Sequence, residues 1–293
     1  MPHHPKSPPV FPYSCASSWG EDQYGLWMSL DYYAVQVFFR WIEPGTFMMG
    51  SPENEKGRFD DEEYHEVTLS QGFWMAETTV TQALWETVME SNPSHFKGED
   101  LPVETVSWDD CQAFIKKMNE QHTELQVRLP WEAEWEYACK AGTETAFNFG
   151  SEISLSQVNY RGVWELSLGK DEEKWNEEAQ DQWGEDAFKK TSNVKHYACN
   201  DWGLYEMHGN VLEWCQDHWQ DSLGKEAVID PKHKETEPEE GAERVFRGGS
   251  WGNDGRNVRS AYRFRNSPDG RFNDLGLRLS LGQPSGSSRG GSR

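Results

Sequence analysis

Apolar and polar residues alternate in the first part of the chain, which is the pattern of strands with one buried face. The alternation covers residues 24–40 and passes into the mostly apolar run 35–42, so we expect a strand pair or one long strand there. Pro44 and Gly45 form a turn signal. Residues 46–50 are then expected to be a further short strand.

Three segments have the signals of amphipathic helices. Residues 81–89 place their apolar side chains on one face. Residues 108–120 follow Ser107, a preferred N-cap residue, and carry two acidic residues in their first turn, where the helix dipole favours negative charge. Residues 131–141 precede Gly142, a residue typical of helix C-termini.

The rest of the chain predicts short strands and long loops. Residues 148–200 are irregular and polar, and strands are expected to return at residues 203–214, 245–251 and 275–281. Few helices among many short strands and turns indicate an α+β fold. We expect a single loop-rich domain over residues 22–282.

Both ends of the chain lie outside this predicted domain. Residues 1–21 are interpreted as a leader, and they lack the charged and then apolar organisation of a Sec signal peptide. Residues 283–293 are rich in Gly, Ser and Arg and predict a flexible tail. The chain has no run of about 18 apolar residues, so the sequence predicts no transmembrane span. We expect a cytoplasmic protein, or one that reaches a surface by another route.

The composition narrows the classes of partner. Hydrophobic residues make up only 35% of the chain, but 15 Trp, 14 Phe and 10 Tyr predict a core built from aromatic rings. The net charge of −22 argues against nucleic acid and against anionic membrane surfaces, because both are bound through basic patches.

The five cysteines do not indicate a disulfide framework. Their number is odd, they are widely spaced, and no CxxC pair occurs. Cys111 and Cys139 lie in helix-like segments with apolar neighbours, so we expect them to be buried free thiols.

Five long motifs resemble those of the formylglycine-generating-enzyme (sulfatase-modifying-factor) family. They are GTFMMGS at residues 45–51, LPVETVSW at 101–108, RLPWEAEWEYA at 128–138, GLYEMHGNVLEW at 203–214 and RGGSW at 247–251. The resemblance covers roughly residues 22–282. It implies a compact, loop-rich variant of the C-type lectin fold with few helices and short strands.

The resemblance fails at the residues that would give the family's catalysis. The family's enzymes carry two cysteines shortly after the Gly-Gly-Ser, which bind copper as soft thiolate ligands. The corresponding positions here are Asn253 and Val258, and no cysteine follows Cys215. The sequence therefore predicts neither copper binding nor formylglycine generation. His208 is expected to be a buried, hydrogen-bonded core histidine.

The resemblance also implies a calcium site, because calcium prefers several oxygen ligands of mixed kind. Carried over from the family, the ligands are the carboxylates of Glu206 and Glu213 and the carbonyls of Gly209 and Val211. A second site would use Asn159, Tyr160 and a later acidic residue, which the insertion at residues 163–190 obscures. Calcium is the one candidate cofactor.

Residues 252–274 resemble the variable region of proteins that are diversified by retroelements and that share this lectin-like fold. Arginines recur through the segment, and the motif Leu-Gly-Leu-Arg-Leu follows it. Mutation of template adenines in Asn codons cannot produce Lys, Glu, Gln, Met or Trp, and none of these five residue types occurs in the segment.

We therefore predict a non-catalytic ligand-binding protein whose C-terminal segment contacts variable, macromolecular ligands. Protein surfaces are the expected partners, since aromatic, Asn, Ser and Gly side chains suit such contacts. The predicted face consists of Asn253, Asp254, Asn257, Tyr262, Phe264, Asn266, Ser267, Gly270, Phe272, Asn273 and Asp274.

Within this face, the three aromatic side chains Tyr262, Phe264 and Phe272 are expected to be exposed on one surface, beside Asn253, Asp254 and Asn273. The arginines are expected to pair inward, with Glu132, Glu136 or Glu213 as candidate partners. Two alternatives stay open: an enzyme of the same family with altered chemistry, and a degenerate or regulatory module.

Overall fold

Two β-sheets and three α-helices form in the part of the chain that the structure describes, namely residues 6–122, 124–164, 184–185, 187–232 and 242–282. In this computed structural model the helices are α1 (Gln82–Met89), α2 (Trp108–Gln121) and α3 (Glu132–Lys140), with a 3₁₀ turn η1 (Gly255–Val258). The strands are β1 (Ser18–Asp22), β2 (Gly25–Tyr32), β3 (Val35–Ile42), β4 (Gly45–Met49), β5 (His65–Leu69), β6 (Phe73–Thr79), β7 (Val127–Arg128), β8 (Leu212–His218), β9 (Val228–Ile229), β10 (Arg244–Arg247), β11 (Arg263–Asn266) and β12 (Leu275–Leu281).

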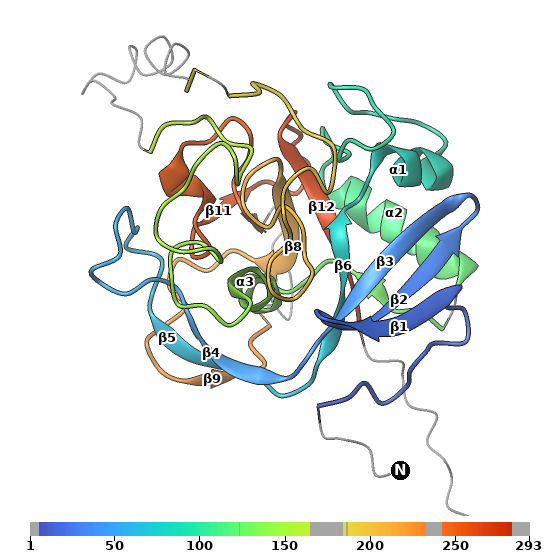
Figure 1. Cartoon of the computed structure of the whole chain (residues 1–293), viewed down its shortest axis with the longest axis horizontal. Helices are drawn as coiled ribbons and strands as arrows, with labels where there is room; N and C mark the ends of the chain where they lie inside the picture. Colours follow the sequence, from blue (N-terminus) through green and yellow to red (C-terminus); the bar gives the residue numbers. More distant parts are fainter. Residues whose placement is uncertain (1–5, 123, 165–183, 186, 233–241, 283–293) are drawn as a thin grey trace, which may run out of the picture.

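The larger sheet is the centre of the fold (Figure 1). Its strand order is β1-β2-β3-β6-β12-β8-β10-β11, with β7 paired to β12. Every residue of β12 is buried, and this strand runs parallel to β8 and antiparallel to β6. The C-terminal strand thus joins the sheet's N-terminal half to the strands that flank residues 252–274.

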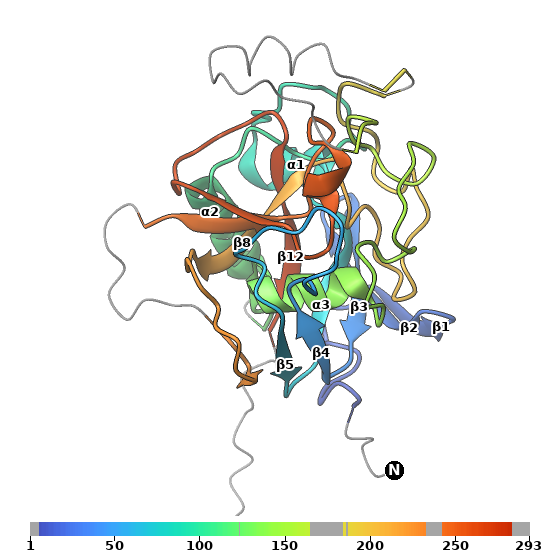
Figure 2. The ribbon, with the colours of Figure 1, turned by 90° about the vertical axis from the view of Figure 1, so that its left-hand side faces the viewer.

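The smaller sheet, β4-β5-β9, lies apart from the edge formed by β1, β2 and β3 (Figure 1). Helix α3 lies between the two sheets, because it contacts β4 of the small sheet and both β8 and β10 of the large sheet (Figure 2). This position buries all nine residues of α3, including three glutamates.

The predicted helices are confirmed within a residue or so at each end. Thr81 caps α1 by accepting a hydrogen bond from the Leu84 N–H, and Ser107 forms a capping box with Asp110 at the start of α2. Helix α3 ends where Ala141 adopts the left-handed conformation. The caps explain why these helix boundaries are readable from the sequence.

The core is largely aromatic, as expected. Trp74, Trp135 and Trp214 are fully buried, and the rings of Trp85 and Phe114 stack at 4.8 Å between α1 and α2. Cys111, Cys139 and Cys215 are buried free thiols, which confirms the prediction for the first two.

Two of the sequence-based expectations about the fold are corrected by larger differences. The sheet begins before residue 22: β1 pairs with β2, and Tyr13 is buried in the core, so part of the predicted leader belongs to the fold. The expected strand at 203–214 is wrong over its first nine residues, which form a buried loop, and β8 starts only at Leu212. The predicted tail, residues 283–293, lies outside the described residues.

No helix among the described residues is long and apolar enough to cross a membrane.

Candidate functional site

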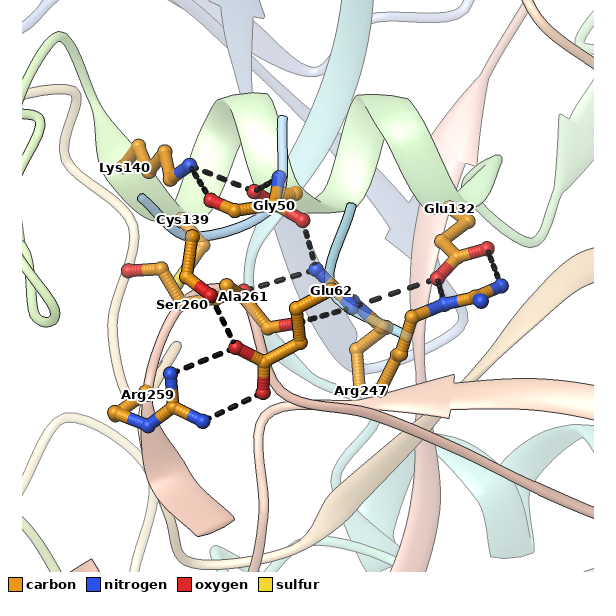
Figure 3. Close-up of polar contacts among 12 residues, drawn as sticks. Gly50, Glu62, Glu132, Cys139, Lys140, Arg247, Arg259, Ser260 and Ala261 are labelled. Carbon is orange, nitrogen blue, oxygen red and sulfur yellow. Dashed lines mark hydrogen bonds and ion pairs between the residues drawn. The ribbon is translucent and has the colours of Figure 1, made fainter. Parts of the chain in front are cut away.

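Helix α3 directs buried carboxylates toward residues 252–274. Glu132 and Glu136 are each 1% exposed, and the guanidinium of Arg247, at the end of β10, lies between them. Arg247 pairs with Glu136 and lies 3.4 Å from a Glu132 oxygen. The same guanidinium donates hydrogen bonds to the carbonyls of Ser260 and Ala261, at 2.9 and 3.0 Å (Figure 3). Arg247 therefore fastens the backbone of the segment to α3.

Two arginines of the segment itself are fixed in the same way. Arg259 is fully buried and donates to both carboxylate oxygens of Glu62, at 2.5 and 2.8 Å (Figure 3). It also donates to Glu55 at 2.7 Å. Arg263 donates to both oxygens of Glu132, at 2.7 and 3.0 Å. The predicted inward pairing is confirmed for Arg259 and Arg263, with Glu132 among the expected partners. Glu55 and Glu62, in the loop before β5, were not anticipated.

Glu213 is held by the arginine of the Leu-Gly-Leu-Arg-Leu motif. The guanidinium of Arg278 bonds to both carboxylate oxygens at 2.8–3.2 Å, and the indole N–H of Trp135 donates to one of them at 2.6 Å. All three side chains are fully or almost fully buried. The negative charge of Glu213 is therefore already compensated by a protein cation.

The other predicted calcium carboxylate is also engaged. Glu206 is 7% exposed, and its carboxylate accepts hydrogen bonds from the backbone N–H groups of Lys195 and Tyr197, at 3.1 and 3.2 Å. Burial raises the pKa of its carboxyl group. Gly209 and Val211 lie in the same buried loop. This donor set does not fit calcium as it stands, because a hard cation needs carboxylate oxygens that are free to bind it. Calcium at this loop stays a prediction.

The second predicted calcium site is only partly within the described residues. Asn159 and Tyr160 are buried, and the Asn159 amide donates to the Asn210 side chain at 3.0 Å. Most of the insertion that would supply the further acid, residues 165–183, lies outside the described part of the chain.

The predicted binding face divides by exposure. Phe264 and Phe272 are 52% and 46% exposed, and Asn273 is exposed too. Tyr262 and Asp254 are 9% and 6% exposed, so their predicted exposure is wrong. The remaining six residues are partly buried: Asn253, Asn257, Asn266, Ser267, Gly270 and Asp274.

The two corrections have specific physical causes. The Tyr262 ring packs at 5.7 Å from the ring of Phe59, which comes from the loop before β5, and burial raises the pKa of its hydroxyl. Asp254 caps the 3₁₀ turn η1 by accepting a hydrogen bond from the Asn257 N–H at 3.2 Å. The Asp254 carboxylate therefore satisfies the local backbone and is not displayed to solvent.

Two neighbouring aromatic residues extend the exposed half of the segment. The rings of Trp251 and Phe96 meet edge to face at 5.5 Å, and the Trp251 indole N–H donates to the Asn273 carbonyl at 3.3 Å. The Phe272 carbonyl accepts a hydrogen bond from the Thr105 N–H at 2.9 Å. Sequence reasoning missed Phe96, because it lies in a loop where no periodicity marks its contacts.

Cys139 and His208 form the pairing that most resembles a nucleophilic site, with Sγ 3.6 Å from Nε2. Both side chains are buried, and burial lowers the pKa of His208 to about 4 and raises that of Cys139 to about 12. An activated thiolate needs the opposite shifts. His208 Nδ1 lies 2.7 Å from the Val258 carbonyl, so the prediction of a hydrogen-bonded core histidine is confirmed.

Known proteins resemble this chain in sequence and in fold. A family model described as "Sulfatase-modifying factor enzyme 1-like domain" matches residues 38–281. The formylglycine-generating enzyme of Bos taurus is 31% identical over 241 residues, which cover 76% of this chain and 58% of that protein. The enzyme of Thermomonospora curvata is 31% identical over 220 residues, with 73% and 60% covered. The chain thus matches about three fifths of the length of these relatives.

Two solved structures share the fold. Treponema denticola variable protein 1 superimposes with a TM-score of 0.69 at 27% identity, covering 88% of this chain and 99% of that one. PvdO from Pseudomonas aeruginosa superimposes with a TM-score of 0.70 at 23% identity, covering 86% and 97%, and shows likeness of fold alone. The predicted sheet-dominated α+β fold is confirmed, and the chain belongs to the sulfatase-modifying-factor family of formylglycine-generating-enzyme-like proteins.

Proposed function

We propose that this protein is a non-catalytic, ligand-binding member of its family, and that the surface around Phe264, Phe272 and Asn273 binds protein ligands. The segment that carries this surface is proposed to be diversified by a retroelement. The proposal is carried by the contrast in burial within residues 252–274. Arg259 and Arg263 are buried in ion pairs, whereas two aromatic side chains and one amide side chain face solvent.

The buried frame gives the surface a fixed backbone. Exposed aromatic rings on a rigid support bind with a small loss of conformational entropy, and adjacent Asn and Ser side chains supply adaptable hydrogen bonds. A large aromatic ring is also the side chain most often dominant in protein interfaces. Phe264 and Phe272 are therefore the proposed anchors.

A concave region beside this surface supports the same interpretation. A cleft of about 410 Å³ is lined by Phe96, Phe188 and His196, and Phe96 contacts Trp251 next to the exposed half of the segment. Clefts lined by aromatic side chains and a few polar groups are typical of ligand-binding sites. A protein loop is the class of ligand that would reach both.

Candidate nucleophiles near the segment are unsuited to catalysis. The Ser250 side chain is fully buried and donates to Asp274 at 2.7 Å, and the Cys139–His208 pair is buried with unfavourable pKa shifts. The likeness to Treponema denticola variable protein 1 over 88% of the chain agrees with a variable, ligand-binding role.

A library experiment tests the binding surface. We expect a library randomised at Phe264, Phe272 and Asn273 to yield binders against a panel of purified proteins without loss of thermal stability. A matched library randomises three exposed positions at the opposite edge of the large sheet, namely Trp19, Asp31 and Gln36. Equal enrichment from both libraries, or none from the first, would contradict the proposed surface.

Two further measurements separate the parts of the proposal. We expect the flanking DNA to contain a reverse-transcriptase gene and, beside it, a near-identical, Asn-rich repeat of the segment. If the repeat is absent, the proposed diversification is wrong, and the library experiment still decides whether the surface binds ligands. Copper-loaded protein is expected not to oxidise a peptide cysteine, because Asn253 and Val258 stand where the family's enzymes carry the two cysteines. Oxidation of such a peptide would replace the proposal with the enzyme alternative.

A further inference from the structure

A cysteine, a histidine and a glutamate converge at a distance from residues 252–274. Cys15, His122 and Glu124 each offer one ligand atom, and these atoms lie within 4.8 Å of one another. Cys15 belongs to the segment before β1, and His122 is the C-cap of α2. Among the described residues, these three form the one group of His, Cys, Asp or Glu side chains whose ligand atoms lie close enough together to hold a metal ion.

A buried hydroxyl provides an independent observation at the same place. Tyr32 is 1% exposed, and its hydroxyl has no hydrogen-bond partner within the described structure. Its ring meets the His122 ring edge to face at 5.0 Å. Buried polar groups in proteins normally have a partner, and a bound water is a common one.

We propose that Cys15, His122 and Glu124 bind one zinc ion, with a water as the fourth ligand near the Tyr32 hydroxyl. Thiolate, imidazole and carboxylate are the three ligand types of zinc sites. Calcium and magnesium prefer oxygen ligands alone, so this mixed set selects against them. A tetrahedral zinc ion requires only a small approach of the three ligand atoms from their present separation.

Zinc at this position connects the N-terminal segment to the rest of the fold. Phe11 stacks on Trp74 at 5.7 Å, and Tyr13 meets the same indole edge to face at 6.3 Å. The ion would fix Cys15, two residues after Tyr13, to the end of α2. Zinc binds a cysteine as its thiolate, so binding at Cys15 releases the thiol proton to solvent.

The test uses the full chain without an affinity tag, with His3 and His4 replaced by Ala to remove another source of metal binding. We expect this protein to bind one zinc ion per chain in equilibrium dialysis. Cobalt in place of zinc is expected to give the near-ultraviolet charge-transfer band of a thiolate ligand. Zinc is also expected to raise the melting temperature, because it binds the folded chain.

Variants assign the ligands. Cys15→Ser is expected to abolish the cobalt–thiolate band and to weaken zinc binding at least about 100-fold, since even the loss of supporting partners costs 10–100-fold. Cys199→Ser, which removes the other partly buried thiol, is the matched control and leaves both unchanged. Tyr32→Phe is expected to weaken zinc binding about 10-fold while the charge-transfer band persists.

The outcomes are distinct. A parent protein without the cobalt–thiolate band, or a Cys15→Ser protein with unchanged zinc affinity, would overturn the site. If Cys15→Ser does not fold, His122→Ala provides the second ligand variant, and the band of the parent protein alone decides whether a thiolate binds the metal. Excess calcium is expected not to compete, and competition at equal concentration would also overturn the assignment.

Discussion

The two halves of residues 254–273 arrange their side chains in opposite ways. Eight of the ten residues from 254 to 263 are buried, and Arg259 and Arg263 are almost inaccessible to solvent. From 264 to 273 every residue is exposed or partly buried. The first half is fixed by Arg247 and by carboxylates from α3 and from the loop before β5, whereas the second half forms the edge strand β11 and the loop that returns to β12.

Arginine shows the difference most directly. Arg259 donates to both oxygens of Glu62, and Arg271 donates to both oxygens of Asp110, so the two contacts are chemically alike. The first pair is fully buried, whereas the side chains of the second are 47% and 33% exposed. Burial, rather than the contact itself, therefore decides how much free energy of unfolding is lost when an arginine is removed.

The largest expected effect is therefore the loss of Arg259. Arg259→Ala leaves the Glu62 carboxylate buried without its cation, and breaking one side of such a pair costs about 3–5 kcal/mol. Arg271→Ala is the matched control and is expected to cost less than about 1 kcal/mol. Urea unfolding of both variants measures the difference, and equal stabilities would erase the proposed contrast between the two halves.

The aromatic residues sharpen the same boundary. Tyr262→Asn removes a ring packed on Phe59 and is expected to lower the free energy of unfolding by about 3 kcal/mol, in the range for buried aromatic truncations. Phe264→Asn and Phe272→Asn are expected to change it by less than about 1 kcal/mol, because both rings are about half exposed. Thermal unfolding of the three single variants checks this. If Phe264→Asn is as unstable as Tyr262→Asn, Phe264 belongs to the buried half of the segment and not to the exposed half.

A pH-dependent contribution is expected from His208, which binds the first half through the Val258 carbonyl. Burial lowers its pKa from 6.5 to about 4, so between these values the unfolded chain binds more protons and stability falls as pH falls. The slope is about 1.4 kcal/mol per pH unit. We expect the parent to lose about 1.2 kcal/mol more than His208→Gln between pH 7 and pH 5.5, since part of this interval lies above the unfolded pKa. Parallel losses in urea unfolding would show that His208 does not titrate with folding.

Calcium is expected to have the smallest effect. Glu213 would have to leave Arg278, and Glu206 would have to leave two backbone amides, before either could bind the ion. We expect excess calcium, added to protein already treated with EDTA and dialysed, to shift the melting temperature by no more than about 2 °C, corresponding to about 1 kcal/mol or less. A larger, reversible shift that is lost in Glu206→Gln would establish calcium binding at this loop.

Local sequence signals determined the elements whose ends are set by nearby residues. Thr81 and Ser107 cap their helices with their own side chains, and the alternating leucines of residues 275–281 fit a strand with an apolar face. Strands β5 and β6 were not predicted, although β6 begins with the apolar run Phe73–Ala76. The pairing of arginines with buried acids was also predictable, because a buried charge requires a partner.

Which acids pair with which arginines, and which aromatic residues face solvent, was decided only by the tertiary structure. Tyr262 and Phe264 lie two residues apart and their rings stack at 6.3 Å, so local periodicity treats them alike. Phe59 covers one ring and leaves the other 52% exposed, although it lies about 200 positions earlier in the chain. Likewise, Cys15 reaches His122 only because the N-terminal segment folds back beside the end of α2. Such contacts depend on the packing of distant loops, which no periodicity in the sequence records.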